Sequence, residues 1–189
     1  MTTPRARLVE LFAKVDTFFD RVHARFPDRD GVTCHAGCDD CCRRRFSVTL
    51  IEAEAIAEAV ASLPEPSRKV LAERALHGDP TVCPALDEGG RCAVYTARPL
   101  ICRTHGLPIR FAAEPPAGKR ALPVHTEPTL DTCPKNFVGR DLAALPADAV
   151  LDQTTLSTIL AALDAAHAAE IDAPRGARID IADILADGD

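Results

Sequence analysis

Large aromatic side chains are scarce in this chain, and tryptophan is absent. Only 4% of the 189 residues are aromatic, with a single Tyr. Aliphatic side chains must therefore fill the core, and an aromatic platform for stacking the bases of single-stranded nucleic acid is not expected. Positive charge is not in excess either, because the net charge is −6 and the pI about 5.5. A nucleic-acid-binding protein typically presents a basic surface, so we expect no nucleic-acid partner.

Long apolar runs are also missing. The most apolar N-terminal stretch, residues 8–19, is interrupted by Glu10, Lys14 and Asp16. A signal peptide needs an unbroken apolar stretch, and a membrane-spanning helix needs about 20 apolar residues. We therefore expect no membrane association and a cytoplasmic location. Thiols are kept reduced in the cytoplasm, where clustered cysteines are more often metal ligands than disulfides.

The composition is otherwise that of an ordered protein. Hydrophobic residues make up 47% of the chain, and 189 residues suffice for one domain with a core. We expect a mainly α fold with a small β-hairpin, in a single compact domain with metal-stabilised cysteine-rich loops. In this interpretation residues 34–133 form a cysteine-cluster core, and residues 1–33 and 134–189 are helical flanks.

Helical periodicity and capping signals give the expected elements. Thr49 and Glu52 have the spacing of a capping box, in which each residue satisfies backbone donors at a helix start. Residues 78–107 are predicted to be mostly loop, and two short strands are expected within 107–126 around a turn at 115–118. The predicted helices cover residues 5–25, 50–63, 66–76 and 152–171, and an apolar tail at 179–185 is expected to pack on the body.

Eight cysteines are the main chemical feature. Two thiolates a few residues apart can bind one ion at little cost in loop closure, and Gly37 permits a tight turn between two of them. The surrounding loops hold few large apolar residues, whereas metal binding can contribute roughly 10 kcal/mol. We predict that all eight are metal ligands: Cys34, Cys38, Cys41, Cys42, Cys83, Cys92, Cys102 and Cys133.

The dense first group suggests how the ligands are shared. We expect Cys34, Cys38 and Cys41 to bind one centre, with a fourth ligand from residues 83–133. Cys42 would serve a second site or support the ligands of the first, because neighbouring side chains of an extended chain point in opposite directions.

Roles other than metal binding fit these cysteines less well. Disulfides conflict with a reducing compartment, and adjacent cysteines pair only with strain. Buried structural thiols could account for one or two residues. A thioredoxin-like redox pair at Cys38 and Cys41 should lie between a strand and a helix, and no strand is expected there. The spacing from Cys34 to Cys41 also matches radical-SAM enzymes, but the repeated βα units of their barrels are missing.

The order of these motifs resembles a known family. The pattern Cys34-x3-Cys38-x2-Cys41-Cys42 is followed by Cys83-Pro84, by Gly90-Arg91-Cys92 and by Arg98-Pro99-Leu100-Ile101-Cys102-Arg103. This resembles the YkgJ-type cysteine-cluster family over roughly residues 34–133. The resemblance implies a zinc- or iron-chelating protein. A related cluster occurs in flagellin lysine-N-methylases, which implies an iron–sulfur site as one option.

Four thiolates suit both zinc and a 4Fe–4S cluster, so both cofactors stay open. Arg103, next to Cys102, is predicted to offset the negative charge of a metal–thiolate centre. No nucleophile–base pair or phosphate loop is readable. We therefore expect a chelator, carrier or metal-stabilised module, with a protein partner left open. The alternative is an iron–sulfur-dependent enzyme or redox partner.

Overall fold

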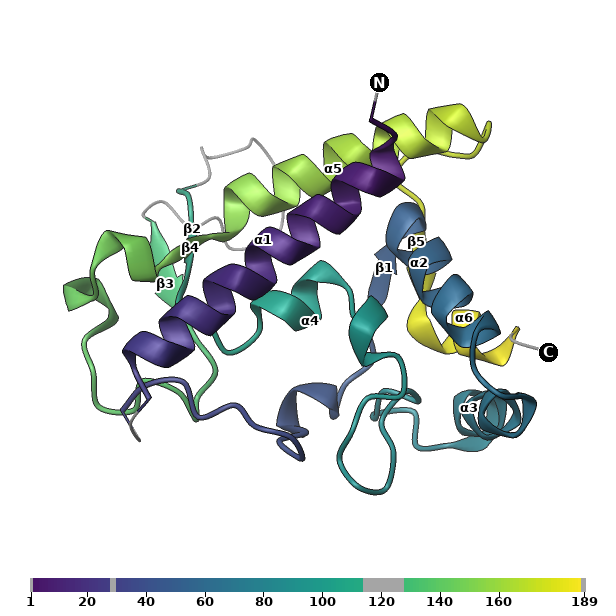
Figure 1. The fold of residues 1–189 in the computed structure, drawn as a ribbon, viewed down its shortest axis with the longest axis horizontal. Helices are drawn as coiled ribbons and strands as arrows, with labels where there is room; N and C mark the ends of the chain where they lie inside the picture. Colours follow the sequence, from purple (N-terminus) through teal and green to yellow (C-terminus); the bar gives the residue numbers. More distant parts are fainter. Residues whose placement is uncertain (1, 28–29, 114–127, 188–189) are drawn as a thin grey trace, which may run out of the picture. The chain divides into compact units, whose positions relative to one another are not determined.

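The computed structural model describes residues 2–27, 30–113 and 128–187. The fold is mainly helical, with 52% helix and 9% strand in small sheets, as the sequence predicted (Figure 1). Within the described ranges, no helix combines the length and apolarity needed to cross a membrane.

The four long predicted helices are confirmed, and each end lies within two residues of its predicted position. Thr49 caps α2 through the predicted capping box with Glu52, and α3 ends before Gly78. Pro27 follows the end of α1, and Pro64 follows the end of α2. Both fit the rule that proline disfavours helix at the residue before it. The α-helices are α1 (Pro4–Arg25), α2 (Leu50–Ala61), α3 (Glu65–His77), α4 (Leu100–Thr104), α5 (Gln153–Glu170) and α6 (Ile181–Ala186). The 3-10 helices are η1 (Asp40–Cys42), η2 (Tyr95–Ala97), η3 (Leu142–Ala144) and η4 (Ala147–Ala149).

Residues 78–107 are mostly loop, as predicted, but they also contain two short helices that were not predicted. Residues 95–97 form η2 and residues 100–104 form α4. Five residues make little more than one turn, so hydrophobic periodicity cannot reveal such a helix. The difference matters because α4 contains Cys102.

The chain divides into two compact units. Unit 1 consists of residues 1–10, 35–102 and 161–189, and unit 2 of residues 11–34 and 103–160. The expected single domain, with a core at 34–133 and two flanks, remains a prediction. The two units do not follow those boundaries, because each is assembled from separate stretches of the chain.

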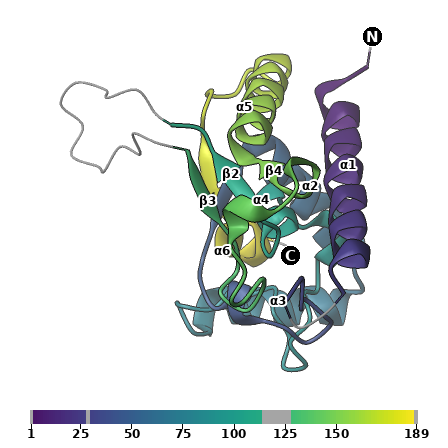
Figure 2. The ribbon, with the colours of Figure 1, turned by 90° about the vertical axis from the view of Figure 1, so that its left-hand side faces the viewer.

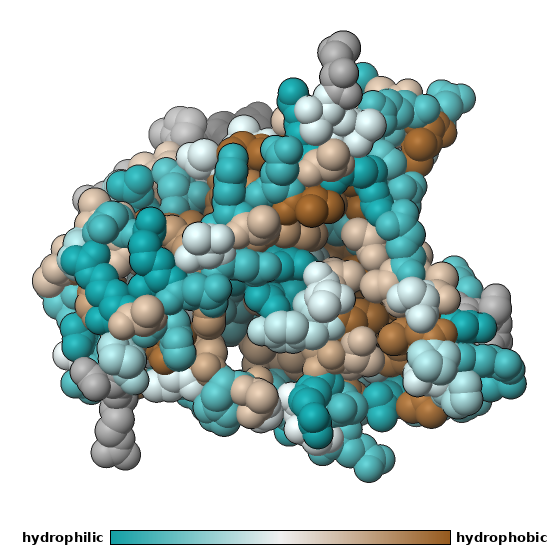
Figure 3. Space-filling model, in the orientation of Figure 1, coloured by the Kyte–Doolittle hydropathy of each residue, from teal (hydrophilic) through white to brown (hydrophobic). Residues whose placement is uncertain are grey.

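Unit 1 is built on α2, α3 and α6, with a two-stranded antiparallel sheet. Its strands are β1 (Ser47–Thr49) and β5 (Arg178–Asp180), with Val48 opposite Ile179. The predicted apolar tail thus forms β5 and α6, which packs on α2 and α3. Figure 3 shows tan and brown side chains around these helices. Its buried core contains Val48, Ala53, Ile56, Val60, Leu71, Ala85, Val94, Ile181, Ile184 and Leu185.

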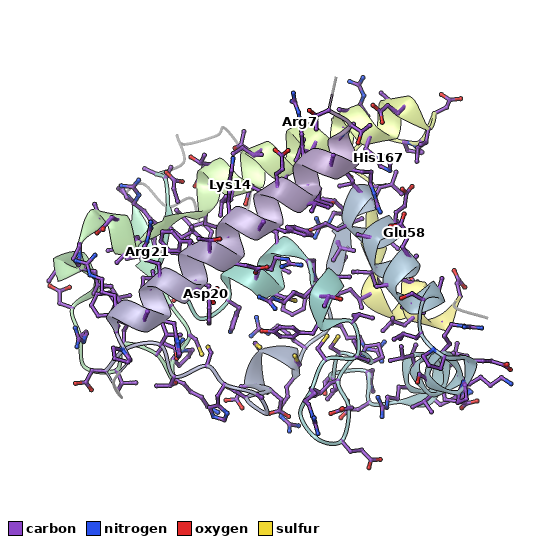
Figure 4. The ribbon with its side chains drawn as sticks, viewed as in Figure 1. Arg7, Lys14, Asp20, Arg21, Glu58 and His167 are labelled. Carbon is purple, nitrogen blue, oxygen red and sulfur yellow. The ribbon has the colours of Figure 1, made fainter. Side chains whose placement is uncertain are left out.

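Polar contacts from two other helices reach α2. His167 of α5 is buried, and its Nε2 lies 2.7 Å from Oε2 of Glu54. Arg5 in the first turn of α1 pairs with the exposed Glu58. Figure 4 labels Glu58 on α2 and His167 on α5. These contacts lie within unit 1 and hold the helix whose first turn carries Glu52.

Unit 2 contains a three-stranded sheet with the order β3-β2-β4. β2 (Ile109–Phe111) pairs antiparallel with β3 (Thr129–Asp131) and parallel with β4 (Leu151–Asp152). Figure 2 shows β2 and β3 side by side. β2 lies within the predicted range of 107–126, but its antiparallel partner β3 lies beyond that range. The predicted turn at 115–118 lies outside the described residues. The buried core of unit 2 contains Val22, Val32, Leu107, Phe137, Ala149 and Leu151.

Candidate metal centre

The first cysteine loop is shaped by Gly37. Its φ of +91° is in the left-handed region that favours glycine. The turn closes with the backbone N–H of Cys38 donating to the carbonyl of His35, at 3.0 Å. The chain then enters η1, which contains Cys41 and Cys42. The predicted tight turn between the cysteines is therefore confirmed.

A second loop lies against the first at another glycine. A Cβ on Gly90 would lie 3.0 Å from the carbonyl oxygen of Gly37 and 3.1 Å from its Cα. Gly90 itself has a φ of +73°. In Figure 1 the dark blue segment after α1 runs beside the teal loop that contains Gly90. This close backbone approach brings residues 87–92 to the first cysteine loop.

Backbone hydrogen bonds place Cys83 and Cys92 beside Cys42. The N–H of Cys83 donates to the carbonyl of Cys42 at 2.8 Å. Leu86 and Cys92 then form an isolated antiparallel bridge, and the N–H of Ala93 donates to the carbonyl of Ala85 at 2.8 Å. Three cysteines that are far apart in sequence thus lie in one neighbourhood.

Cys102 joins this neighbourhood from α4. The pKa of its thiol is raised to about 12, first by burial and then by the charges of Cys83, Cys92 and Cys41. Burial also raises the pKa of Cys83 and of Cys92, and each of them interacts with Cys41. Thiolates that share a buried region repel one another and lose hydration, so each favours its protonated form.

Cys41 and Cys42 form a hydrogen-bonded pair of thiols. Donation from Cys42 lowers the pKa of Cys41 to about 7. The same hydrogen bond, together with burial, raises the pKa of Cys42, which donates the proton. Cys41 is therefore the thiol of this group that is most readily ionised, which favours it as a metal ligand over Cys42.

Two arginines contribute positive charge near the thiols. Arg45 lowers the pKa of Cys83 and Arg98 lowers that of Cys92, in both cases against the larger effect of burial. Among the described residues, the Nε of Arg45 is buried and has no hydrogen-bond partner. Sequence reasoning singled out Arg103 instead, because Arg103 follows a cysteine directly.

Arg103 lies in unit 2, where it contacts α1. It is buried, forms an ion pair with Asp16, and places its guanidinium 4.2 Å from the centre of the Phe12 ring. A cation above an aromatic face is favourable in a desolvated position. These contacts explain how Arg103 is held, and its predicted role beside a metal remains a prediction.

The remaining cysteines have different surroundings. Cys34 and Cys133 belong to unit 2. The side-chain amide of the buried Asn136 donates to Sγ of Cys34 at 3.3 Å and to the carbonyl of Gly106 at 2.7 Å. The N–H of Asn136 also donates to the carbonyl of Cys133, at 2.8 Å. Sequence reasoning missed Asn136, because no short motif connects it with Cys34, 102 residues away.

The structure brings together part of the predicted ligand set. Cys41, Cys42, Cys83, Cys92 and Cys102 interact within unit 1, Cys38 lies in the loop before η1, and Cys34 and Cys133 lie in unit 2. All eight are described, and none forms a disulfide. Across the described part of the chain, no three Cys, His, Asp or Glu side chains are already positioned to hold a metal ion.

A separate groove of about 590 Å³ lies in unit 1 between α2 and the β5–α6 segment. Its walls are formed mainly by apolar residues such as Ala53, Ala57 and Ile184, with Glu54 and Arg68 among the polar ones. None of the eight cysteines lines this groove. This groove therefore does not coincide with the thiol neighbourhood.

Comparison with known proteins gives one match. Residues 33–117 match the CxxCxxCC family, whose description reads "putative zinc- or iron-chelating domain". No curated protein and no solved structure matches the chain. The matched segment contains the two loops, α4 and seven of the eight cysteines. Residues 33–117 of this chain are therefore similar to the CxxCxxCC family, and the match covers less than half of the chain.

Proposed function

We propose that the chain binds zinc or an iron–sulfur cluster through four thiolates of unit 1: Cys41, Cys83, Cys92 and Cys102. One observation carries this proposal. Thiols from three separate stretches of sequence lie close enough in a buried region to raise one another's pKa, and Cys102 reaches about 12. A shared cation would reverse the repulsion that produces this effect.

The donor chemistry fits such a group. Four thiolates can hold zinc or a 4Fe–4S cluster. Thiols with raised pKa values must lose their protons on binding, so binding is coupled to proton release. The buried Nε of Arg45 is a donor that a neighbouring thiolate of Cys83 would satisfy. Binding of the metal or cluster requires the thiols to rotate toward one point, which breaks the hydrogen bond between Cys42 and Cys41.

The surroundings favour a chelator, a carrier or a metal-stabilised module. None of the thiols lines the described groove in unit 1, so that groove does not serve the proposed centre. Catalysis at a metal needs an open coordination position with access for a substrate. The alternative is an iron–sulfur-dependent enzyme or redox partner. The cofactor found in the purified protein distinguishes a zinc centre from an iron–sulfur centre.

Anaerobic purification followed by metal analysis and a visible spectrum tests the proposal. Iron with sulfide and broad visible absorption identifies an iron–sulfur centre, whereas a colourless protein with stoichiometric zinc identifies a zinc centre. If neither metal co-purifies and all eight thiols react freely with a thiol reagent, the proposal is wrong.

Two matched cysteine variants test the ligand set. Cys102→Ser should lose most of the bound metal, because serine is a poor ligand for both zinc and iron–sulfur clusters. Cys133→Ser, in unit 2, should retain the metal of the four-thiolate centre. Equal loss in both variants would contradict the proposed set and would return Cys133 to the ligands, as the sequence predicted.

A further inference from the structure

Glu52 is a buried acidic residue whose role exceeds that of a helix cap. Glu52 is only 3% exposed to solvent. Oε2 accepts hydrogen bonds from the backbone N–H of Thr49 at 3.1 Å and from its hydroxyl at 2.8 Å. These two bonds complete the capping box at the start of α2. They occupy one carboxylate oxygen and leave the other for a different partner.

The second oxygen contacts the start of α4. Oε1 accepts a hydrogen bond from the N–H of Leu100, at 2.8 Å, across 48 residues of sequence. Leu100 is the first residue of α4 and is itself buried. The N–H groups of a first helical turn have no partner within the helix, so a carboxylate there both satisfies a donor and fixes the helix start.

Cys102 lies two residues after this anchor, in the same helical turn. Its own N–H donates to the carbonyl of Pro99 at 3.0 Å, which continues the tight start of α4. The direction of the Cys102 side chain is therefore fixed by where α4 begins. Glu52 is the residue of α2 that sets that beginning.

We propose that Glu52 is a positioning residue for the metal centre, which holds Cys102 in place through its hydrogen bond to Leu100. This inference rests on the proposed function, because it assumes that Cys102 is a ligand. The negative charge of Glu52 also opposes ionisation of Cys102, although it is the smallest of the named causes. The carboxylate therefore acts through the hydrogen bonds that both of its oxygens accept rather than through its charge.

An amide at this position would be a poor substitute. Glutamine offers one acceptor oxygen and one NH₂ donor, whereas the site presents donors to both oxygens of Glu52. Thr49 presents two donors and Leu100 presents one, so in Glu52→Gln we expect the amide oxygen to stay with Thr49 and Leu100 to lose its acceptor. Glu58→Gln is the matched control, because Glu58 lies on the same helix and is exposed (Figure 4).

The test compares metal binding by the full-length chain and its variants. The readout is the visible spectrum and the affinity for the metal found in the wild type, with Co²⁺ replacing zinc if the wild type contains zinc. Glu52→Gln should bind at least tenfold more weakly with a shifted spectrum, and Glu58→Gln should match the wild type. Thr49→Ala separates stability from positioning: it should unfold at a lower temperature and keep the wild-type spectrum.

A double-mutant cycle identifies Cys102 as the residue through which Glu52 acts. In a Cys102→Ser background, Glu52→Gln should cause no further loss of affinity, because the residue that it positions is absent. A second readout needs no metal: exchange of the Leu100 amide hydrogen should be slow in the wild type and fast in Glu52→Gln. If Glu52→Gln fails to fold, Glu52→Asp carries the same test, since its shorter side chain cannot span Thr49 and Leu100.

The outcomes separate this inference from the proposed function. A wild-type chain without metal overturns the proposed function. A wild type that binds metal, together with Glu52→Gln that binds equally well with the same spectrum, overturns the inference alone. The inference alone is also overturned if Glu52→Gln weakens metal binding in the Cys102→Ser background by the same factor as in the wild type.

Discussion

The cysteines of unit 1 and those of unit 2 are held in different ways. In unit 1, Cys83, Cys92 and Cys102 have one another and Cys41 as charged neighbours, and burial raises the pKa of all three. In unit 2, Cys34 has an amide donor in Asn136 and packs against the apolar cluster that contains Val32 and Leu107.

The difference shows why one residue type can carry two roles. A thiol with its own donor and apolar neighbours is stable as it stands, since cysteine packs like a small hydrophobe. Several thiols that share one buried space are stable together only while protonated or while bound to a cation. If the proposed centre binds metal, its effect on stability should therefore be confined mainly to unit 1.

Metal removal should give the largest difference between the two units. Metal binding contributes roughly 10 kcal/mol in small structural sites. Removal of the metal by a chelating reagent should therefore sharply increase amide hydrogen exchange in the loops of unit 1. The backbone amides of Cys83 and Ala93 report on this, since both donate across the loops. The amides of Asn136 and Phe137 in unit 2 should change little. Equal loss of protection in both units would contradict the comparison.

Substitution of Asn136 should give the next largest effect, confined to unit 2. Its Oδ1 accepts from the N–H and the hydroxyl of Thr33, at 3.0 and 2.8 Å. Asn136→Ala removes these bonds and the one to Gly106. The hydroxyl of Thr33 and the carbonyl of Gly106 keep second partners, Lys135 and Thr132, but the N–H of Thr33 loses its acceptor. The free energy of unfolding should fall by about 3 kcal/mol. Denaturant unfolding measures this change.

The same variant should leave the metal content of the centre in unit 1 unchanged. Faster alkylation of Cys34 by a thiol reagent should accompany the loss of its hydrogen bond to Asn136. Loss of metal in Asn136→Ala would show that Cys34 belongs to the same centre as Cys41, which is the grouping that the sequence predicted.

Two glycine variants test whether the position of Cys34 depends on close packing. Gly106 and Gly139 have φ values of +95° and +78°, so alanine is strained at both. A Cβ on Gly106 would lie 2.7 Å from Sγ of Cys34, whereas nothing lies within 4 Å of a Cβ on Gly139. Gly106→Ala should therefore destabilise the protein by about 2 kcal/mol more than Gly139→Ala, measured by denaturant unfolding. Equal effects would mean that the strain lies only in the backbone.

The stability of the metal-free protein is also predicted to depend on alkaline pH. Cys102 has a pKa of about 12 in the fold against an ordinary value of 9.0, so the folded chain keeps a proton that the unfolded chain loses. The free energy of unfolding should be unaffected by this group below pH 9 and fall as the pH rises from 9 toward 12. The slope is at most about 1.4 kcal/mol per pH unit for one group.

The Cys102→Ala variant provides the control for this titration. Its stability should fall less steeply above pH 9, with the remaining slope coming from Cys42, Cys83 and Cys92, whose pKa values are also raised. Cys41, with a pKa of about 7, acts in the opposite direction and only below pH 9. An identical slope in the variant and the wild type would contradict the burial of the Cys102 thiol.

Much of the local structure could be predicted from the sequence. The capping box at Thr49 and Glu52 is a local signal, and so is the tight turn at Gly37, because each depends on residues close in sequence. The helix α4 could not be predicted in this way, because its first residue is anchored by Glu52, 48 positions earlier. The amide of Asn136 that reaches Cys34 is equally remote.

The sequence by itself determined the long helices, the cysteine-bearing loops and the kind of chemistry that eight thiols can perform, seven of which lie in the segment that matches the CxxCxxCC family. Only the tertiary structure decided which thiols are neighbours. That choice depends on backbone hydrogen bonds such as the one from Cys83 to Cys42, on the contact of Gly90 with Gly37, and on the anchoring of α4. The spacing of cysteines along a chain limits only the partners within one loop. Contacts between loops are set by packing and by hydrogen bonds that no short motif encodes.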